Sequence, residues 1–498
     1  MRQLLAPSAA LAAILIPVPA LADLSALDVW DSWKSYMEDS GYTVEIGSQD
    51  VVGSSLILRN VEMKVLSDEA DMRATLSNID LRELGDGRVE ITMANDIPVT
   101  LNAKGEEEVD IAMVMRQSGL MITASGDPAA ITYDFEAQTM SVDFDKFVVE
   151  GEQVEPELSM VMTGIEGKSA MREDGGWHAE GGGTVDAVNA NFSFTDSESG
   201  ETVTGQITMA DLSSQSTTFI GEGYDPADPA SFFGGDMMAK GNVTMGNSLF
   251  QISASGEENF DLTASAGSQS FDFELADGSI GYSADATNVA YNFSSPDMPF
   301  PPINVSIEQS GGAFQFPLGA SDEMQDFRMM FSLQGLTTEE FLWGMIDPAG
   351  MLPRDPANLR VDVSGKLRSL VDLFDEEAVE EYGDEMPFEL GNMDINDVSL
   401  SIAGASVDAV GAFTFDNSDL ETFDGLPAPT GSVDINIYGI NGLIDTLVQM
   451  GLIPDDQAMG ARMMMGAFAR PGDGEDHLTS QIEVNRDGSF FANGMQLQ

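Results

Sequence analysis

The sequence contains no cysteine in its 498 residues. Disulfide bonds, thiolate nucleophiles and cysteine-ligated zinc or iron–sulfur sites are therefore excluded. Attachment of a lipid anchor to a cysteine is excluded for the same reason. We expect packing and sheet hydrogen bonds alone to stabilise the fold.

Basic residues are also scarce. The chain has 21 Lys and Arg residues against 84 Asp and Glu residues, which gives a formal net charge of −63. Nucleic-acid recognition depends on contacts from Lys and Arg to phosphates, so we expect no nucleic-acid partner. Apolar residues make up 43% of the chain, which is enough for a sizeable core and argues against wholesale disorder.

Signatures of catalysis are missing. There are two histidines, His178 and His477, each in a segment rich in Gly and acidic residues, and no G-x-S-x-G sequence occurs. The segment 167–169 (GKS) ends like a phosphate-binding loop, but Met162 stands where that loop requires its first glycine. Pro226 likewise breaks a dinucleotide-binding fingerprint. We expect no enzyme activity, no catalytic residue and no cofactor.

Possible metal ligands are abundant but lack a recognisable spacing. No EF-hand loop and no Gly-Gly-x-Gly-x-Asp repeat occurs. Residues 473–477 (DGEDH) combine suitable ligand types, but an exposed turn is the favoured interpretation. The 30 methionines raise Cu(I) binding near Met459 and Met463 as an alternative, whereas a core or groove lining fits their helical spacing better. No metal site is predicted.

The N-terminus has the pattern of a secretory signal peptide. Arg2 precedes an apolar run over residues 4–18, and Ala20-Leu-Ala22 forms an A-x-A cleavage site. The run is shorter than the ~20 residues of a spanning helix, and no later segment is long enough. We expect residues 1–22 to be removed and the mature chain to reside in the periplasm without a transmembrane segment.

From residue 42 to about residue 293, apolar residues alternate with polar and often acidic ones. Phe271, Phe273 and Leu275 are one example, and Leu56, Leu58 and Val61 are another, with one break in register. Period two with one solvated face is typical of antiparallel sheet. Turn sequences separate the runs without intervening helices, which indicates meanders.

Helical periodicity enters in the C-terminal half. Three stretches, residues 331–343, 361–373 and 435–447, change from period two to a spacing of three or four after a glycine, and we interpret them as strand-Gly-helix units. Helices are predicted at residues 24–39 (with a capping box between Ser25 and Asp28), 337–346, 367–382, 442–451 and 455–468. A hairpin is predicted over residues 478–497 from its turn at Asp487-Gly488.

These patterns predict an α+β, mainly β protein with extended antiparallel meander sheets and a few amphipathic helices packed on them. Four prolines within residues 294–302 mark a boundary, because proline removes backbone donors. We therefore predict a β-rich domain with an N-terminal helix at residues 23–295. The second predicted domain, residues 296–498, is α+β and contains the strand-Gly-helix units.

Two regions resemble known families. Residues 41–47 (GYTVEIG) and 53–65 (GSSLILRNVEMKV), after a short helix, resemble the start of AsmA-like proteins. That resemblance implies a curved sheet whose apolar face is associated with lipid passage between membranes. Residues 340–348 (EFLWGMIDP) and 352–357 (LPRDPA) resemble an uncharacterised family of exported bacterial proteins, a domain of unknown function, which carries no established activity.

Two functional hypotheses follow. The first is a periplasmic protein of the cell envelope that binds or passes lipids or other apolar ligands along a β-sheet groove. Its predicted apolar groove or core residues are Met113, Met115, Phe135, Phe144, Phe271, Phe273, Met459 and Met463. The alternative is a structural or interaction module of the envelope, whose acidic surface engages a protein partner or weakly binds divalent cations.

Overall fold

The computed structural model describes residues 23–66, 70–104, 108–149, 152–154, 157–195, 199–223, 237–257, 259–276, 278–373, 375–383 and 386–497. The predicted signal peptide, residues 1–22, lies outside the described residues. None of the described helices is both long enough and apolar enough to cross a membrane.

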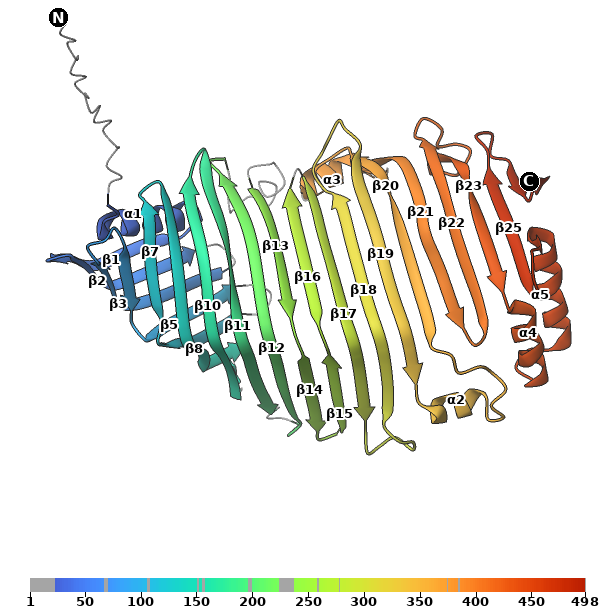
Figure 1. Ribbon diagram of the computed structural model, residues 1–498, viewed down its shortest axis with the longest axis horizontal. Coiled ribbons are helices and arrows are strands. Elements are labelled where there is room, and N and C mark those ends of the chain that lie inside the picture. The colour runs from blue at the N-terminus through green and yellow to red at the C-terminus, as the bar shows by residue number, and fades with distance from the viewer. Residues whose placement is uncertain are drawn as a thin grey trace, which may run out of the picture.

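The described strands form one 27-stranded sheet that extends along the long axis of the molecule (Figure 1). All of its strand pairs are antiparallel, so the prediction of an antiparallel, mainly β fold is confirmed. The strands are β1 (Thr43–Val52), β2 (Ser55–Leu66), β3 (Ala70–Glu83), β4 (Val89–Met93), β5 (Asp96–Lys104), β6 (Glu108–Ser118), β7 (Met121–Asp127), β8 (Ala130–Val149), β9 (Glu152–Val154), β10 (Glu157–Glu173), β11 (Gly176–Thr195), β12 (Thr202–Gly221), β13 (Met237–Met245), β14 (Ser248–Ser255), β15 (Phe260–Ala266), β16 (Gln269–Ala276), β17 (Ser279–Ser294), β18 (Ile303–Pro317), β19 (Gln325–Thr338), β20 (Ala357–Ser369), β21 (Phe388–Ile402), β22 (Ala405–Asp416), β23 (Ala428–Tyr438), β24 (Arg470–Pro471), β25 (His477–Val484), β26 (Phe490–Ala492) and β27 (Met495–Gln496).

The spatial order of the strands follows their order in the chain. Most long strands pair with the strand before and the strand after them, as in a simple meander. In four rows of the sheet, two shorter strands lie end to end and together take the place of one long strand. These end-to-end pairs are β4 with β5, β6 with β7, β13 with β14, and β15 with β16.

Residues in the left-handed backbone region interrupt several of the long strands. They are Asn60 in β2, Gly164 in β10, Asp211 in β12, Asn288 in β17 and Gly335 in β19, with φ between +50° and +68°. Each of these residues has no directly paired residue on the neighbouring strand, and the pairing resumes on the far side of it. The unpaired positions of neighbouring strands lie next to one another. The left-handed residues therefore form a line across the sheet, which we call the transverse line.

At the transverse line, the alternation of side chains between the two faces shifts by one residue. The same face of the sheet therefore stays apolar on both sides of the line. In β2, Leu58 and Val61 flank Asn60 and lie three positions apart, yet both are fully buried in the same core. In an uninterrupted strand, residues three apart point to opposite faces. The positive φ of Asn60 turns the chain at this point and removes the conflict, and because Gly47 of the partner strand is skipped as well, the pairing on either side is not shifted. The break in register predicted around residues 56–61 is therefore a feature of the whole sheet.

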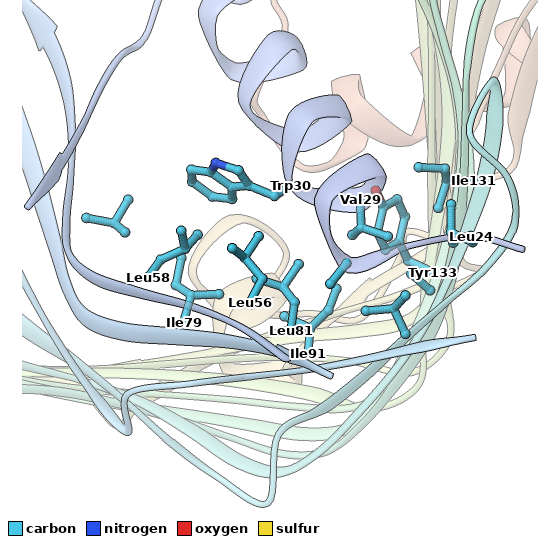
Figure 2. Close-up of a cluster of buried hydrophobic side chains, with 14 of the residues drawn as sticks. Leu24, Val29, Trp30, Leu56, Leu58, Ile79, Leu81, Ile91, Ile131 and Tyr133 are labelled. Atoms are coloured by element: carbon cyan, nitrogen blue, oxygen red, sulfur yellow. The ribbon is translucent and has the colours of Figure 1, made fainter. Parts of the chain in front are cut away.

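The first helix, α1 (Ala26–Asp39), packs into the curl of the N-terminal strands (Figure 2). Its predicted capping box is confirmed: the Asp28 N–H donates to Ser25 Oγ at 3.2 Å, and the Ser25 N–H donates to Asp28 Oδ2 at 3.0 Å. Trp30 is 1% exposed and lies among Leu56, Leu58 and other strand residues. The helix predicted at residues 24–39 thus packs against the strands of the main core.

The remaining helices are α2 (Glu340–Ile346), α3 (Glu376–Tyr382), α4 (Ile440–Gln449) and α5 (Asp455–Phe468). The prediction for α5 is confirmed residue for residue, and that for α4 is confirmed within two residues. The helix predicted at residues 367–382 is wrong in its first half, because residues 367–369 continue β20 and pair with β21. The C-terminal hairpin is confirmed as β25 and β26.

The three strand-Gly-helix units do not share one structure. Gly439 alone meets the prediction, because it follows β23 and adopts φ +70° as the N-cap of α4. Gly335 belongs to the transverse line and β19 continues beyond it, whereas Gly365 lies inside β20. At Gly335 the apolar spacing of three arises in a reset strand. β20 has no left-handed residue, and the spacing after Gly365 arises because Leu367 and Leu370 lie on either side of the end of the strand.

The predicted domain boundary at residues 294–302 stays a prediction. The hydrogen-bonded sheet continues across it, since β17 pairs with β18 from Ser279–Pro317 to Phe293–Ile303.

The transverse line generates a stability prediction. Gly164→Ala should lower the unfolding free energy by about 1–3 kcal/mol, because a left-handed alanine is strained and its methyl group meets the Asp186 carboxylate. Urea unfolding of the purified chain measures this loss. Gly175→Ala is the matched control, because Gly175 has nearly the same φ of +63° but open space at its Cβ position. Equal losses in the two variants would contradict a role for the Asp186 contact.

Candidate apolar binding face

Two neighbouring rows of directly opposed residues cross the sheet from β8 to the C-terminal strands. Residues that pair directly across antiparallel strands lie on the same face. The first row comprises Tyr133, Ser169, Gly181, Ser216, Gly241, Phe273, Tyr282, Phe314, Met329, Val363, Ile395, Gly411, Val433, Ile482 and Ala492. The second comprises Phe135, Gly167, Gly183, Ser214, Val243, Phe271, Ala284, Gly312, Phe331, Val361, Val398, Ala409, Ile435 and Ser480. We call them the apolar rows.

Neither apolar row contains a charged residue, although 21% of the chain is charged. The row between them points to the opposite face and has a different composition. It comprises Asp134, Lys168, Gly182, Gln215, Asn242, Asp272, Ser283, Ala313, Met330, Asp362 and Asp397. The alternation predicted from the sequence therefore places the charged residues of these three rows on one face of the sheet, from β8 to β21.

Helix α1 covers one end of the apolar rows. Trp33 stacks on Tyr133 with ring centroids 6.1 Å apart, and Tyr36 meets Trp177 edge-on at 5.6 Å. The Trp177 indole also donates to Asp39 Oδ2 at 2.7 Å. Burial raises the pKa of Tyr133 to about 12, as expected for a phenol that has lost contact with water.

Further along the sheet, from β16 to β19, the apolar rows are open. Tyr282 is 48% exposed, Met329 56% and Phe331 47%, whereas Tyr133 under α1 is 5% exposed. Aromatic rings continue along the face, with Tyr282 and Phe314 5.4 Å apart between centroids. Large apolar side chains at this exposure form a surface that water hydrates poorly.

Glycines in the apolar rows seat aromatic rings. The ring of Phe135 lies over Gly167 and that of Phe273 over Gly241, at positions where a Cβ atom would collide with the ring. A ring lying over a cross-strand glycine compensates for the side chain that the glycine lacks. The glycines therefore let large rings lie flat on the sheet.

The structure brings six of the eight predicted groove residues onto this face. Phe135, Phe271 and Phe273 belong to the apolar rows. Met113 and Met115 are half-buried; Met113 is opposed to Phe144, and Met115 to Ile97, which packs on the α1 core. The other two, Met459 and Met463, lie on α5 with 68% and 75% exposure, outside the rows.

A depression of about 1100 Å³ opens between β10 and β19, and its lining mixes polar and apolar side chains. Charged side chains there are Lys168, Glu180, Lys240, Asp272, Glu274 and Arg328, while Phe273, Tyr282 and Phe314 contribute from the apolar rows. Lys168 pairs with Asp134 at 3.5 Å, and Lys240 with Glu274 at 3.7 Å. The depression is therefore not lined by apolar side chains alone, whereas the exposed side chains of Tyr282, Met329 and Phe331 lie on an open face.

The two histidines have local partners. His477 stacks on Tyr438 with centroids 4.2 Å apart, and one ring nitrogen lies 3.3 Å from Asn436 Oδ1. His178 packs against Phe219 at 4.7 Å. Within the described parts of the chain, no group of three or more His, Asp or Glu side chains is arranged to hold a metal ion.

Asp476, in the acidic segment 473–477, has a structural role that the sequence did not reveal. Its carboxylate accepts the Asn441 N–H at 3.1 Å and the Gly442 N–H at 2.8 Å, at the N-terminus of α4. A negative charge there also complements the helix dipole. The residue comes from a turn more than 30 positions away, so only the tertiary fold brings it to the helix.

Asp347 organises the loop between α2 and β20, and sequence reasoning missed it. Its side chain is fully buried and accepts the Met351 N–H at 2.9 Å, the Leu352 N–H at 2.8 Å and Arg354 Nη1 at 2.8 Å. Arg354 also pairs with Glu340 and lies over the Trp343 ring at 4.7 Å. Desolvation alone would raise the pKa of Asp347, but these donors outweigh it and hold the pKa at about 2.

These loop residues are the ones that carried the second resemblance. Comparison with protein-family models matches residues 246–497 to a family described as an uncharacterized protein conserved in bacteria, DUF2125. The chain belongs to this family. No curated protein matches the sequence. The comparisons give no AsmA-like match, so the resemblance of residues 41–65 to those proteins has no support from them.

Side chains within the loop between α2 and β20 hold it in place. The segments 340–348 and 352–357 contribute Glu340, Trp343, Asp347 and Arg354, which contact one another and fix the loop. The two segments that resemble the family therefore contain residues that stabilise this loop.

The buried carboxylate predicts a pH effect on stability. The folded pKa of Asp347 lies below the ordinary value of 3.8, so its stabilisation is present above about pH 4 and disappears as the pH falls toward 2. Asp347→Asn should therefore lower the urea midpoint at pH 7, and the gap to wild type should narrow at pH 3. Asp297→Asn, at an exposed position, is the control. A gap that stays constant from pH 7 to pH 3 would contradict the prediction.

Proposed function

We propose that this protein binds lipids or other elongated apolar ligands along the apolar rows of its sheet. The observation that supports this most strongly is the pair of rows without charge, open from β16 to β19, in a chain of net charge −63. Solubility alone does not require such a surface. Exposed contiguous apolar patches usually mark binding sites.

The shape of the face favours a chain-like ligand over a compact one. Adjacent strands lie about 4.8 Å apart, so the apolar rows extend for roughly 65 Å between β8 and β26. Rings lying flat over glycines leave a shallow surface without a closed cavity, which suits the side of an acyl chain. Contacts with apolar side chains are dispersive and non-directional. We therefore propose that the face binds elongated apolar ligands as a class and does not recognise one particular compound.

The proposed role is that of a non-enzymatic carrier or binding protein. The predicted signal peptide leads us to propose the periplasm as its location, where lipids moving between membranes need protection from water. The charged face stays solvated and keeps the complex soluble.

The ligand is tested by producing the chain from Asp23 onward in the periplasm, purifying it without detergent and analysing an organic extract by mass spectrometry. Stoichiometric co-purifying lipid supports the proposal. A lipid-free monomer that binds no fluorescent fatty acid would overturn it. If that monomer melts at a higher temperature in millimolar Ca²⁺, the acidic, weakly cation-binding envelope module becomes the better explanation.

Variants on one strand test the site. Phe271→Ser combined with Phe273→Ser should weaken binding of a fluorescent fatty acid at least about tenfold, because burial of each aromatic side chain contributes about 1.5–3 kcal/mol. Asp272→Ser is the matched control, since it lies between them on the opposite face. Circular dichroism and melting temperature establish that each variant is folded. Equal binding by the double variant and wild type would place the ligand elsewhere.

A further inference from the structure

Helix α5 presents its own apolar surface, separate from the apolar rows. Met459, Met463, Met464 and Phe468 lie on its outer side, with Met463 75% exposed and Met464 66%. In Figure 1, α5 lies beside α4 at the C-terminal end of the molecule. We call these four residues the α5 patch.

The α5 patch cannot turn inward, because the opposite side of the helix is fixed. Ala458 is buried, and Arg462 pairs with Asp445 of α4 at 2.6 Å. At the C-terminal end of α5, the backbone carbonyl of Phe468 accepts hydrogen bonds from Ser480 Oγ at 2.6 Å and from Asn493 Nδ2 at 2.8 Å. These bonds attach α5 to both α4 and the last strands, so the patch is held facing outward.

The charge around the α5 patch differs from that of the chain as a whole. Acidic residues make up 84 of 498 positions, about one in six, yet none occurs from residue 457 to residue 472. The same segment holds Arg462 and the exposed Arg470. Asp455 and Asp456 lie in the first turn of α5, and the next acidic residue is Asp473. The patch is thus a place where an anionic surface meets little repulsion.

From this geometry we propose that α5 docks on the surface of a phospholipid bilayer. Flexible methionines and a phenylalanine enter the boundary between headgroups and acyl chains, as in interfacial helices, and Arg470 faces the phosphates. A second copy of this chain is the less suitable occupant, because it would bring another net charge of −63 to the contact, whereas a zwitterionic phosphatidylcholine surface brings none. The inference does not depend on ligand binding at the apolar rows.

The test is flotation of the mature chain with phosphatidylcholine vesicles, and with vesicles that also contain one-fifth phosphatidylglycerol. We expect wild type to float with both. Met463→Gln combined with Met464→Gln should reduce the bound fraction at least about tenfold in partition coefficient. Met121→Gln is the control. Met121 is also exposed, but it lies on strand β7, where it is opposed to Glu136 on the charged face.

Three outcomes would overturn the proposal: wild type that does not float, a double variant that floats like wild type, and a wild-type dimer that the double variant converts to monomer. The last would assign the patch to a second copy and is detected by sedimentation. The Phe271→Ser and Phe273→Ser variant should still float, which separates failure of membrane docking from failure of ligand binding.

Discussion

The architecture depends on keeping one face of a very long sheet apolar. Strands of up to 20 residues carry two stretches of alternating side chains, and the alternation changes phase between them. The left-handed residues of the transverse line absorb this change, so Leu58 and Val61 can both enter one core. Without the reset, half of every long strand would direct its apolar side chains into water. The position of α1 and the continuity of the apolar rows both follow from it.

Asymmetry between the two ends of the apolar face gives the molecule a direction. At the N-terminal end the aromatic residues of α1 cover the sheet, and Tyr133 is buried. Beyond β16 the same face is open, and at the C-terminal end the helices turn an apolar surface outward. If the apolar rows bind a ligand as proposed, the open stretch beyond β16 is where it would enter.

Local patterns predicted the elements better than their arrangement. The capping box at Ser25, the whole of α5 and the C-terminal hairpin could be read from the sequence, because each depends on residues close together in the chain. The alternation around Phe271 and Phe273 also predicted that both rings share one face, opposite Asp272. The helix predicted from residue 367 was wrong in its first half because the apolar spacing of three between Leu367 and Leu370 spans the end of β20 instead of following a helix.

The contacts of Asp347 and Asp476 could not be predicted, since a lone acidic residue in a loop looks the same whether it is solvated or buried. Its role depends on which backbone N–H groups the fold brings to it. The sequence likewise could not separate the methionines of α5 from those of the sheet, because both occur at amphipathic spacing.

The meander has a consequence for how such a protein can change in length. Each strand is bonded only to its neighbours, so the stability of the sheet is close to a sum of nearest-neighbour contributions, as in repeat proteins. Adding or deleting one hairpin that contains its own left-handed residue would widen or narrow the sheet by two strands and leave the remaining pairs intact. Evolution can therefore adjust the span of such a sheet in steps of roughly 10 Å without redesigning either end.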